Sequence, residues 1–195
     1  MIVLRLKLKK ADLNYPKAVA KKKKSKNNFA FIALGTNKGD RIAYLRKAIL
    51  MLSQSASGGS KVKILNSSSV YETKPFGKVE QSNFLNAVIK VKTSYNLIEL
   101  FKNLKNIETK LGRNETIKWG PREIDLDLLF FNDRIFKNEK LKVPHSGIQD
   151  RDFVLIPLRE IAPNFIHPVL KKKISDICKE DISRNIIRKT RLKIN

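Results

Sequence analysis

The segment KWGPREIDLDLLFF, residues 118–131, places two carboxylates inside a run that otherwise has the apolar and aromatic character of a buried strand. Burying an unpaired carboxylate is costly, so Asp125 and Asp127 must meet cations wherever this strand folds. Because side chains alternate faces along a strand, the two aspartates share one face, with Cα atoms about 6.6 Å apart. The other face is apolar and consists of Ile124, Leu126, Leu128 and Phe130.

Hydrophobic periodicity predicts the elements around this strand. The first two are a strand at 29–34 and a helix with Asp40 as its N-cap and apolar positions at Ile42, Leu45, Ile49 and Leu52. Strand-like runs follow at 61–74 and 83–93. A second helix has leucines at 97, 100, 104 and 111 and stops at Gly112, and the strand at 124–131 comes last. The order β-α-β-β-α-β predicts an α/β (α+β) fold with a ferredoxin-like core and additional helices and strands.

Composition sets further bounds. A chain of 195 residues with 42% hydrophobic content fits one globular domain. The single cysteine, Cys178, excludes an internal disulfide and is typical of a reducing compartment. No apolar run approaches the ~18 residues of a membrane span, and the N-terminus has no signal-like apolar stretch. We therefore expect a cytoplasmic protein without a membrane partner.

The net charge of +23 is concentrated at the two ends of the chain. Residues 1–28 hold ten Lys and Arg against one Asp, and residues 171–195 hold nine against three acids, while residues 29–170 hold 22 against 14. We predict a flexible basic extension at 1–28, a folded domain at 29–170 and a basic extension at 171–195. The isoleucines of this last segment, at 174, 177, 182 and 186, favour a helix that packs on the domain. Charge alone attracts polyphosphate and nucleic acid equally well.

The aspartate pair can be interpreted in two ways. Two carboxylates on one strand face can hold Mg²⁺, which takes one or two carboxylates plus phosphate oxygens, or they can form salt bridges to nearby cations. The surroundings favour a phosphate site, because cations and one indole flank the pair: Arg113, Lys118, Trp119 and Arg122 upstream, and His145 and Arg151 downstream. Positioning and charge neutralisation of this kind are the means of phosphoryl transfer. The turn ALGTNKGD, residues 33–40, lacks the spacing of a P-loop.

Five segments together resemble the 6-hydroxymethyl-7,8-dihydropterin pyrophosphokinase family over residues 29–170. They are ALGTNKGDR, SSVYETKPFG followed by QSNFLNAV, IETKLGR, WGPREIDLDLLFF and VPHSGIQDRDFVLIPLREIAP. The resemblance implies a ferredoxin-like fold. It also implies transfer of the pyrophosphoryl group of ATP to 6-hydroxymethyl-7,8-dihydropterin, with release of AMP, as a step of folate biosynthesis.

The same resemblance assigns roles to individual residues. Two Mg²⁺ ions would be held by Asp125 and Asp127. The pterin would contact Thr73, Phe76, Phe84, Asn86 and Phe153. ATP would contact Lys105, Glu108, Lys118, Trp119, Arg122, Leu128, His145 and Arg151. The catalytic set is Arg113, Trp119, Arg122, Asp125 and Asp127, of which the first two lie on a mobile loop.

The chain departs from the family pattern around that loop. Lys118 stands where Arg is usual, which keeps the charge but loses the bidentate fork, and the segment between Gly112 and Trp119 is shorter by about one residue. A pterin-binding protein with weakened catalysis is therefore one alternative. An RNA-binding module is another, but the aromatic pattern of RNA-recognition strands is absent. We expect a monomer that does not bind nucleic acid.

Overall fold

The computed structural model describes residues 27–54, 61–76, 80–113, 120–178 and 184–194. The elements are β1 (Asn28–Thr36), α1 (Arg41–Ser53), β2 (Val62–Ser67), β3 (Tyr71–Thr73), β4 (Phe84–Thr93), α2 (Leu97–Lys110), β5 (Asp125–Phe131), β6 (Phe136–Lys137), β7 (Lys142–Val143), the 3-10 helix η1 (Ile148–Asp150), α3 (Asp152–Ile161), α4 (Ile174–Ile177) and β8 (Ile186–Lys189). No helix among these has the length and apolarity needed to cross a membrane.

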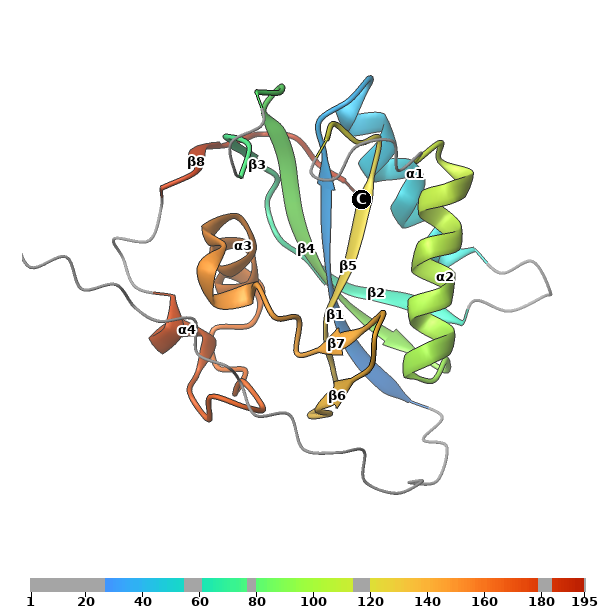
Figure 1. Cartoon of the computed structure of the whole chain (residues 1–195), viewed down its shortest axis with the longest axis vertical. Helices are drawn as coiled ribbons and strands as arrows, with labels where there is room; N and C mark the ends of the chain where they lie inside the picture. Colours follow the sequence, from blue (N-terminus) through green and yellow to red (C-terminus); the bar gives the residue numbers. More distant parts are fainter. Residues whose placement is uncertain (1–26, 55–60, 77–79, 114–119, 179–183, 195) are drawn as a thin grey trace, which may run out of the picture.

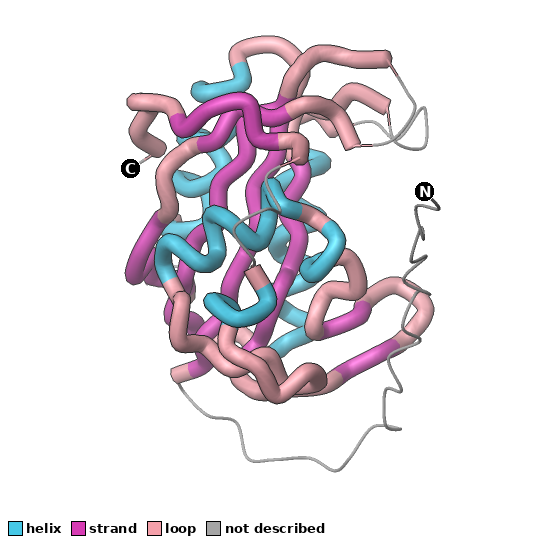
Figure 2. The backbone as a smooth tube through the Cα atoms, turned by 90° about the vertical axis from the view of Figure 1, so that its left-hand side faces the viewer, coloured by secondary structure: helices cyan, strands magenta, loops and turns pink. Residues whose placement is uncertain are grey.

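Within the described residues, six strands form one antiparallel sheet in the order β5-β1-β4-β3-β8, and β2 also pairs with β4. Helices α1 and α2 lie on one side of the sheet, and α3 and α4 lie on the other (Figure 1). Seen from the α3 side, the helices of that side lie in front of the strands (Figure 2). The first six elements, β1 to α2, together with β5 reproduce the predicted ferredoxin-like core, with β2 and β3 sharing the place of its second strand.

Helix ends follow the predicted capping chemistry. The side chain of Asp40 accepts a hydrogen bond from the backbone N–H of Ala43, which fixes the start of α1. Helix α2 starts with a capping box in which Asn96 and Glu99 each bond the other's backbone N–H. Gly112, with φ of +92°, follows its last turn, a conformation that favours glycine.

Each face of the sheet carries its own apolar cluster. Strand residues such as Ile32, Leu34 and Leu126 pack under α1 and α2. On the other face, Phe31, Val88, Leu129, Phe130 and residues of α3 and α4 form a second cluster. The second cluster covers only part of its face, so the ends of β1, β4 and β5 remain open beside α3. A cavity lies in that opening.

The second cluster corrects one prediction. Phe130 was expected on the same face as Leu126 and Leu128, but it lies on the α3 side beside Leu129. The register between β1 and β5 shifts there, because Phe31 pairs with Phe130 while Ile32 pairs with Leu128. Such a bulge inserts one residue and reverses the alternation beyond it.

Two segments differ from the predicted elements. The run at 61–74 forms two strands rather than one, because the hydroxyl of Ser68 accepts the N–H of Val88 in place of a continuous ladder. In the C-terminal segment, the helix extends only over Ile174–Ile177, and Ile186–Lys189 is a strand. The chain between them, 179–183, is outside the described residues, as is most of the N-terminal extension.

Candidate active site

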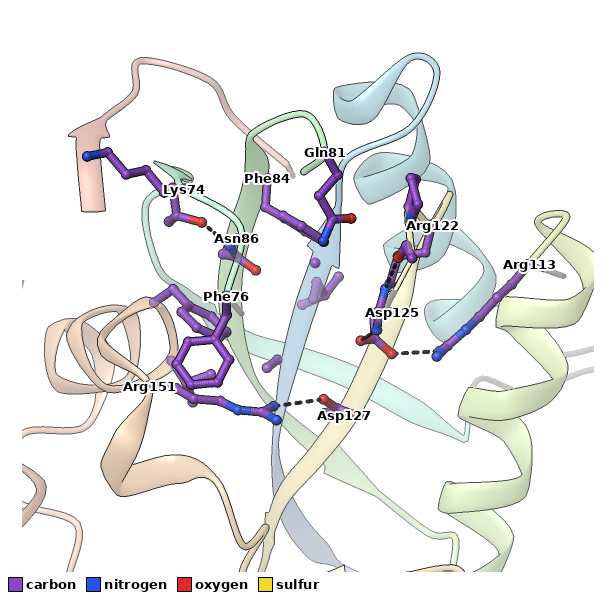
Figure 3. Close-up of a pocket in the computed structure, with 18 of the residues that line it drawn as sticks. Lys74, Phe76, Gln81, Phe84, Asn86, Arg113, Arg122, Asp125, Asp127 and Arg151 are labelled. Atoms are coloured by element: carbon purple, nitrogen blue, oxygen red, sulfur yellow. Dashed lines mark hydrogen bonds and ion pairs between the residues drawn. The ribbon is translucent and has the colours of Figure 1, made fainter. Parts of the chain in front are cut away.

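A cavity of about 670 Å³ opens at the uncovered end of the sheet, between β3, β4, β1, β5 and the start of α3. One half is lined by aromatic, amide and hydroxyl groups together with Lys74, and the other half mainly by charged groups (Figure 3). Twelve of the predicted site residues line it: Thr73, Phe76, Phe84, Asn86, Lys105, Arg113, Arg122, Asp125, Asp127, His145, Arg151 and Phe153.

Gly35 connects the two halves at the floor of the cavity. It is the register partner of Asn86 on β4 and of Asp125 on β5, so these three residues form one row across the sheet. A Cβ atom at Gly35 would lie 2.9 Å from Oδ1 of Asn86, closer than such contacts normally come. Glycine at this position therefore leaves room for the amide and the carboxylate on either side.

Asp125 is bound by two arginines. Nη1 of Arg113 lies 2.6 Å from one carboxylate oxygen, and Nη1 of Arg122 lies 2.6 Å from the other. Burial alone would raise the pKa of Asp125, but the two guanidinium groups outweigh burial and hold that pKa below its usual range. The predicted cost of burying this carboxylate is thus met by arginine in this structure.

Asp127 is less closely paired. Among the described residues, Lys105, Arg151 and the ring of His145 lie 3.9–4.0 Å from its oxygens. Burial lowers the pKa of His145, and the nearby Asp127 opposes this only in part, so the ring is neutral at pH 7. Because Nδ1 of His145 accepts the N–H of Gly147, the ring proton belongs on Nε2, which faces Asp127.

Arg151 reaches Asp127 across two of the three phenyl rings that line the cavity. Its guanidinium carbon lies 5.8 Å from the centroid of Phe76 and 5.9 Å from that of Phe153. A Cβ atom at Gly147 would lie 2.7 Å from Nε of Arg151, so glycine is needed there for this side-chain path. The arginine therefore lies where the aromatic half meets the charged half (Figure 3).

Glu108 joins α2 to the charged half from behind. One of its oxygens accepts hydrogen bonds from Lys105 at 2.8 Å and from the backbone N–H of Leu126 at 2.6 Å, and it lies 2.7 Å from Arg113. Burial raises the pKa of Glu108, while Lys105 opposes that change. Glu108 thus positions two cations of the cavity rather than lining it.

Arg122 is held through its backbone. The side chain of Asn37 accepts its N–H at 2.8 Å, and the N–H of Asn37 bonds the Arg122 carbonyl at 3.1 Å. The Asn37 amide also donates to Gln81 and to the carbonyl of Ser82. The buried side chain of Asn37, in the turn after β1, therefore connects the segment before β5, at Arg122, with the segment before β4, at Gln81 and Ser82.

The aromatic half is built on one amide. The Asn86 side chain, 7% exposed, donates a hydrogen bond of 2.8 Å to the hydroxyl of Thr73 on the neighbouring strand. Phe76 and Phe153 face each other with centroids 5.8 Å apart and planes tilted by 58°. The amide retains its oxygen and one N–H for a ligand beside two aromatic faces.

Two predicted residues, Lys118 and Trp119, lie outside the described residues, and two others do not line the cavity. Glu108 stands behind the cavity wall. Leu128 was predicted to contact ATP, but its side chain is 3% exposed and packs in the core under α2. The alternation of β5 explains this, because Leu128 faces away from Asp125 and Asp127. Sequence reasoning also gave no role to the lining residues Gly35, Lys74 and Gln81, all of which lie in the segments that carry the family resemblance.

Residues 31–163 match the family model for 7,8-dihydro-6-hydroxymethylpterin-pyrophosphokinase (HPPK). The chain belongs to this family. It is therefore an ATP-dependent pyrophosphokinase of folate biosynthesis, which transfers the pyrophosphoryl group of ATP to the hydroxymethyl group of the dihydropterin. The fold, the family and the reaction predicted from the sequence are confirmed.

Relatives of known name agree with the family model. The chain is 44% identical over 151 residues to the 2-amino-4-hydroxy-6-hydroxymethyldihydropteridine pyrophosphokinase of Aquifex aeolicus, covering 77% of this chain and 91% of that protein. It is 47% identical over 135 residues to the enzyme of the same name from Bacillus subtilis, covering 69% and 78% respectively.

Solved structures support the fold. The structure of Plasmodium falciparum HPPK-DHPS with pterin and p-hydroxybenzoate matches with a TM-score of 0.62 and 21% identity. The match covers 80% of this chain but 42% of the Plasmodium chain. HPPK therefore shares its fold with one part of that longer protein.

Proposed function

We propose that the two halves of the cavity divide the two substrates of HPPK between them. The dihydropterin binds in the aromatic half, at Thr73, Phe76, Phe84, Asn86 and Phe153. The triphosphate of ATP binds in the charged half, at Lys105, Arg113, Arg122, His145 and Arg151. The observation that carries this proposal is the row Asn86–Gly35–Asp125, which joins an amide site for a heterocycle to a charged site for phosphate on one floor.

The aromatic half suits a flat heterocycle with a polar edge. Asn86 offers a donor and an acceptor in a buried place, which matches the mixed hydrogen-bonding edge of a pterin. A ring stacked between two others needs a centroid separation of roughly 7 Å, at about 3.5 Å of contact distance on each side. Phe76 and Phe153 are 5.8 Å apart, so one ring must move. Phe76 is the more mobile candidate, since it is 40% exposed.

The reaction forms a bond between the hydroxymethyl oxygen of the pterin and the β-phosphorus of ATP. The bond between that phosphorus and the oxygen bridging to the α-phosphate breaks, AMP leaves with the bridging oxygen, and the hydroxyl proton is lost. Arg113, Arg122 and Arg151 would neutralise charge on the phosphate oxygens, and the neutral His145 would donate from Nε2. Held in the cavity, the hydroxyl would lie in position for in-line attack.

We further propose that Asp125 and Asp127 hold two Mg²⁺ ions. The donor set fits this ion, because both groups are carboxylates on one face of β5, and Mg²⁺ takes its remaining ligands from phosphate and water. No group of three or more His, Cys, Asp or Glu side chains in the described residues forms a complete metal cage, which leaves those positions to the substrate. Bound Mg²⁺ supplies charge neutralisation on the triphosphate. Arg113 and Arg122 would then exchange Asp125 for phosphate oxygens.

A coupled assay of AMP release tests the division. Asn86→Ala should raise the KM for the pterin and leave the KM for ATP unchanged, whereas Lys105→Ala should do the reverse. Loss of ATP affinity in Asn86→Ala with unaltered pterin affinity would overturn the proposal. A monomeric state, a cytoplasmic location and the absence of a nucleic-acid partner stay predictions.

A further inference from the structure

The C-terminal residues 184–194 lie beyond the family match, and their strand β8 forms the edge of the sheet next to β3 (Figure 1). Thr73 and Lys74, at the end of β3, line the cavity. Strand β8 pairs antiparallel with β3, which places Ile186 opposite Thr73 and Lys189 opposite Tyr71. The N–H of Lys74 bonds the carbonyl of Asn185 at 2.8 Å, and both the N–H and the hydroxyl of Thr190 bond the carbonyl of Val70 at 2.9 Å. This segment therefore holds β3 along its whole length.

The same segment binds the start of α3 through a buried carboxylate. Asp152 is 2% exposed, and its oxygens accept the backbone N–H groups of Asn185 and Ile186 and, at 2.8 Å, the side-chain amide of Asn185. A buried carboxylate is tolerated where such donors satisfy it. Asp152 stands between Arg151 and Phe153 in the chain, and both of these line the cavity.

The segment thus bridges the two walls of the aromatic half. One wall is β3, with Thr73 bound to Asn86, followed by Phe76; the other is the first turn of α3, with Phe153. Beyond the bridge, Ile194 is buried in the core, and the carbonyl of Lys193 accepts a hydrogen bond from Arg46 of α1. Exposed ion pairs from Arg188 to Glu72 and from Lys189 to Glu160 add little. The buried contacts carry the argument.

We propose that residues 184–190 set the width and register of the pterin half of the site, and that Asp152 and Asn185 are its positioning residues. Neither residue needs to touch the substrate. Without the N–H donors of the C-terminal segment, the Asp152 carboxylate would keep only the backbone N–H of Phe153, at 2.9 Å, and would lose its other three donors, so the first turn of α3 would rearrange and take Phe153 with it. This proposal rests on the proposed function, because it assumes that the pterin binds in the aromatic half.

Steady-state kinetics of the full-length chain test the proposal. Asp152→Ala should raise the KM for the dihydropterin about tenfold and Asn185→Ala about threefold, while the KM for ATP and kcat each change less than twofold. The matched controls are Asp176→Ala and Asn164→Ala, two exposed residues on the same side of the sheet. They should leave all three parameters unchanged. Thermal unfolding of each variant is measured alongside, and Asn185→Ala keeps the test valid if Asp152→Ala does not fold.

Two results would overturn the proposal. One is a lower melting temperature in both variants with an unchanged KM for the pterin, since the contact would then serve stability alone. The other is an equal change in both KM values, which would mark a general disturbance. Asn86→Ala is assayed in parallel. If it raises the KM for the pterin while the C-terminal variants do not, only the positioning role fails; if it too has no effect, the proposed division of the cavity fails and this inference falls with it.

Discussion

The two halves of the HPPK cavity are held in place by different forces. In the charged half, side chains position one another through ion pairs of 2.6–2.8 Å, such as those joining Arg113 to Asp125 and to Glu108. In the aromatic half, one amide–hydroxyl bond and the strand pairing of β3 fix the walls, and the rings of Phe76 and Phe153 lie against each other and beside Arg151.

This difference has consequences for binding. An arginine that is paired with a carboxylate can pair with a phosphate instead without losing hydrogen bonds. The cations of the charged half are therefore already in position, and phosphate oxygens can replace their carboxylate partners. In the aromatic half the Asn86 amide is fixed by the hydroxyl of Thr73, and only the rings of Phe76 and Phe153 must separate. We therefore expect variants of the charged half to affect chemistry, and variants of the aromatic half to affect affinity for one substrate.

The largest effect is expected at Asp127. Asp127→Ala should lower kcat by at least about 100-fold, because it removes one of the two carboxylates proposed to hold Mg²⁺ on the triphosphate. AMP release at saturating Mg²⁺ measures this. Asp133→Ala, an exposed carboxylate just after β5, is the control and should behave as wild type. A variant that kept more than about a tenth of the activity would remove Asp127 from the metal site.

Asn86→Ala should produce the next largest effect, on the other half. Removing the amide leaves the polar edge of the bound pterin unpaired, at a cost of about 1–3 kcal/mol in binding. Calorimetry with the pterin and with an ATP analogue measures both affinities on one protein. We expect the nucleotide affinity to stay the same, and equal losses for both ligands would contradict separate halves.

A pair of glycines offers a sharper comparison with a smaller effect. Gly35→Ala places a methyl group 2.9 Å from the Asn86 oxygen, and Asn86 cannot turn away without losing Thr73. Gly147→Ala places one 2.7 Å from Nε of Arg151. We predict a roughly fivefold rise in the KM for the pterin in the first variant and for ATP in the second, about 1 kcal/mol each. A higher KM for ATP in Gly35→Ala, or a higher KM for the pterin in Gly147→Ala, would show that the two halves are coupled through Arg151.

Much of this arrangement follows from sequence pattern alone. Periodicity placed the core strands and both large helices, and alternation along β5 put Asp125 and Asp127 into one space. These predictions succeed because local spacing determines which face a side chain occupies. They fail where pairing with a strand distant in the sequence determines the face. Phe130 is an example, because it changes face at a bulge in the pairing with β1.

The partners of the carboxylates could not be predicted in the same way. The sequence favoured a metal as the compensation for Asp125, while in this structure Arg113 and Arg122 provide it, and that choice depends on how α2 and the turn before β5 approach the strand. The C-terminal segment was likewise expected to be helical, because its isoleucines have helical spacing. Edge pairing to β3 and the demand of Asp152 for N–H donors make 186–189 a strand instead.

The smallest predicted effect concerns pH and the two histidines of the chain. Burial lowers the pKa of His145 in the charged half, and it lowers the pKa of His167, which packs against Phe130, to about 4. Since the unfolded chain protonates its histidines near pH 6.5, it binds more protons than the folded chain below that value. The stability from both residues is therefore complete above about pH 6.5 and is lost as the pH falls towards the folded pKa.

Between pH 7.5 and 5.5, His167 should account for a loss of about 1 kcal/mol in the free energy of unfolding, and His145 for less, because Asp127 partly offsets its burial. Urea unfolding of wild type, His145→Gln and His167→Gln at the two pH values gives the change in unfolding free energy with pH for each protein. The difference between wild type and a variant is the contribution of that histidine, because the carboxylates contribute equally to both proteins. His167→Gln should flatten the pH dependence more than His145→Gln. If His145→Gln flattened the pH dependence more, the folded protein would disfavour the protonated form of His145 more strongly than that of His167. The carboxylate of Asp127, 4.0 Å from Nε2 of His145, would then stabilise the protonated ring less than we expect.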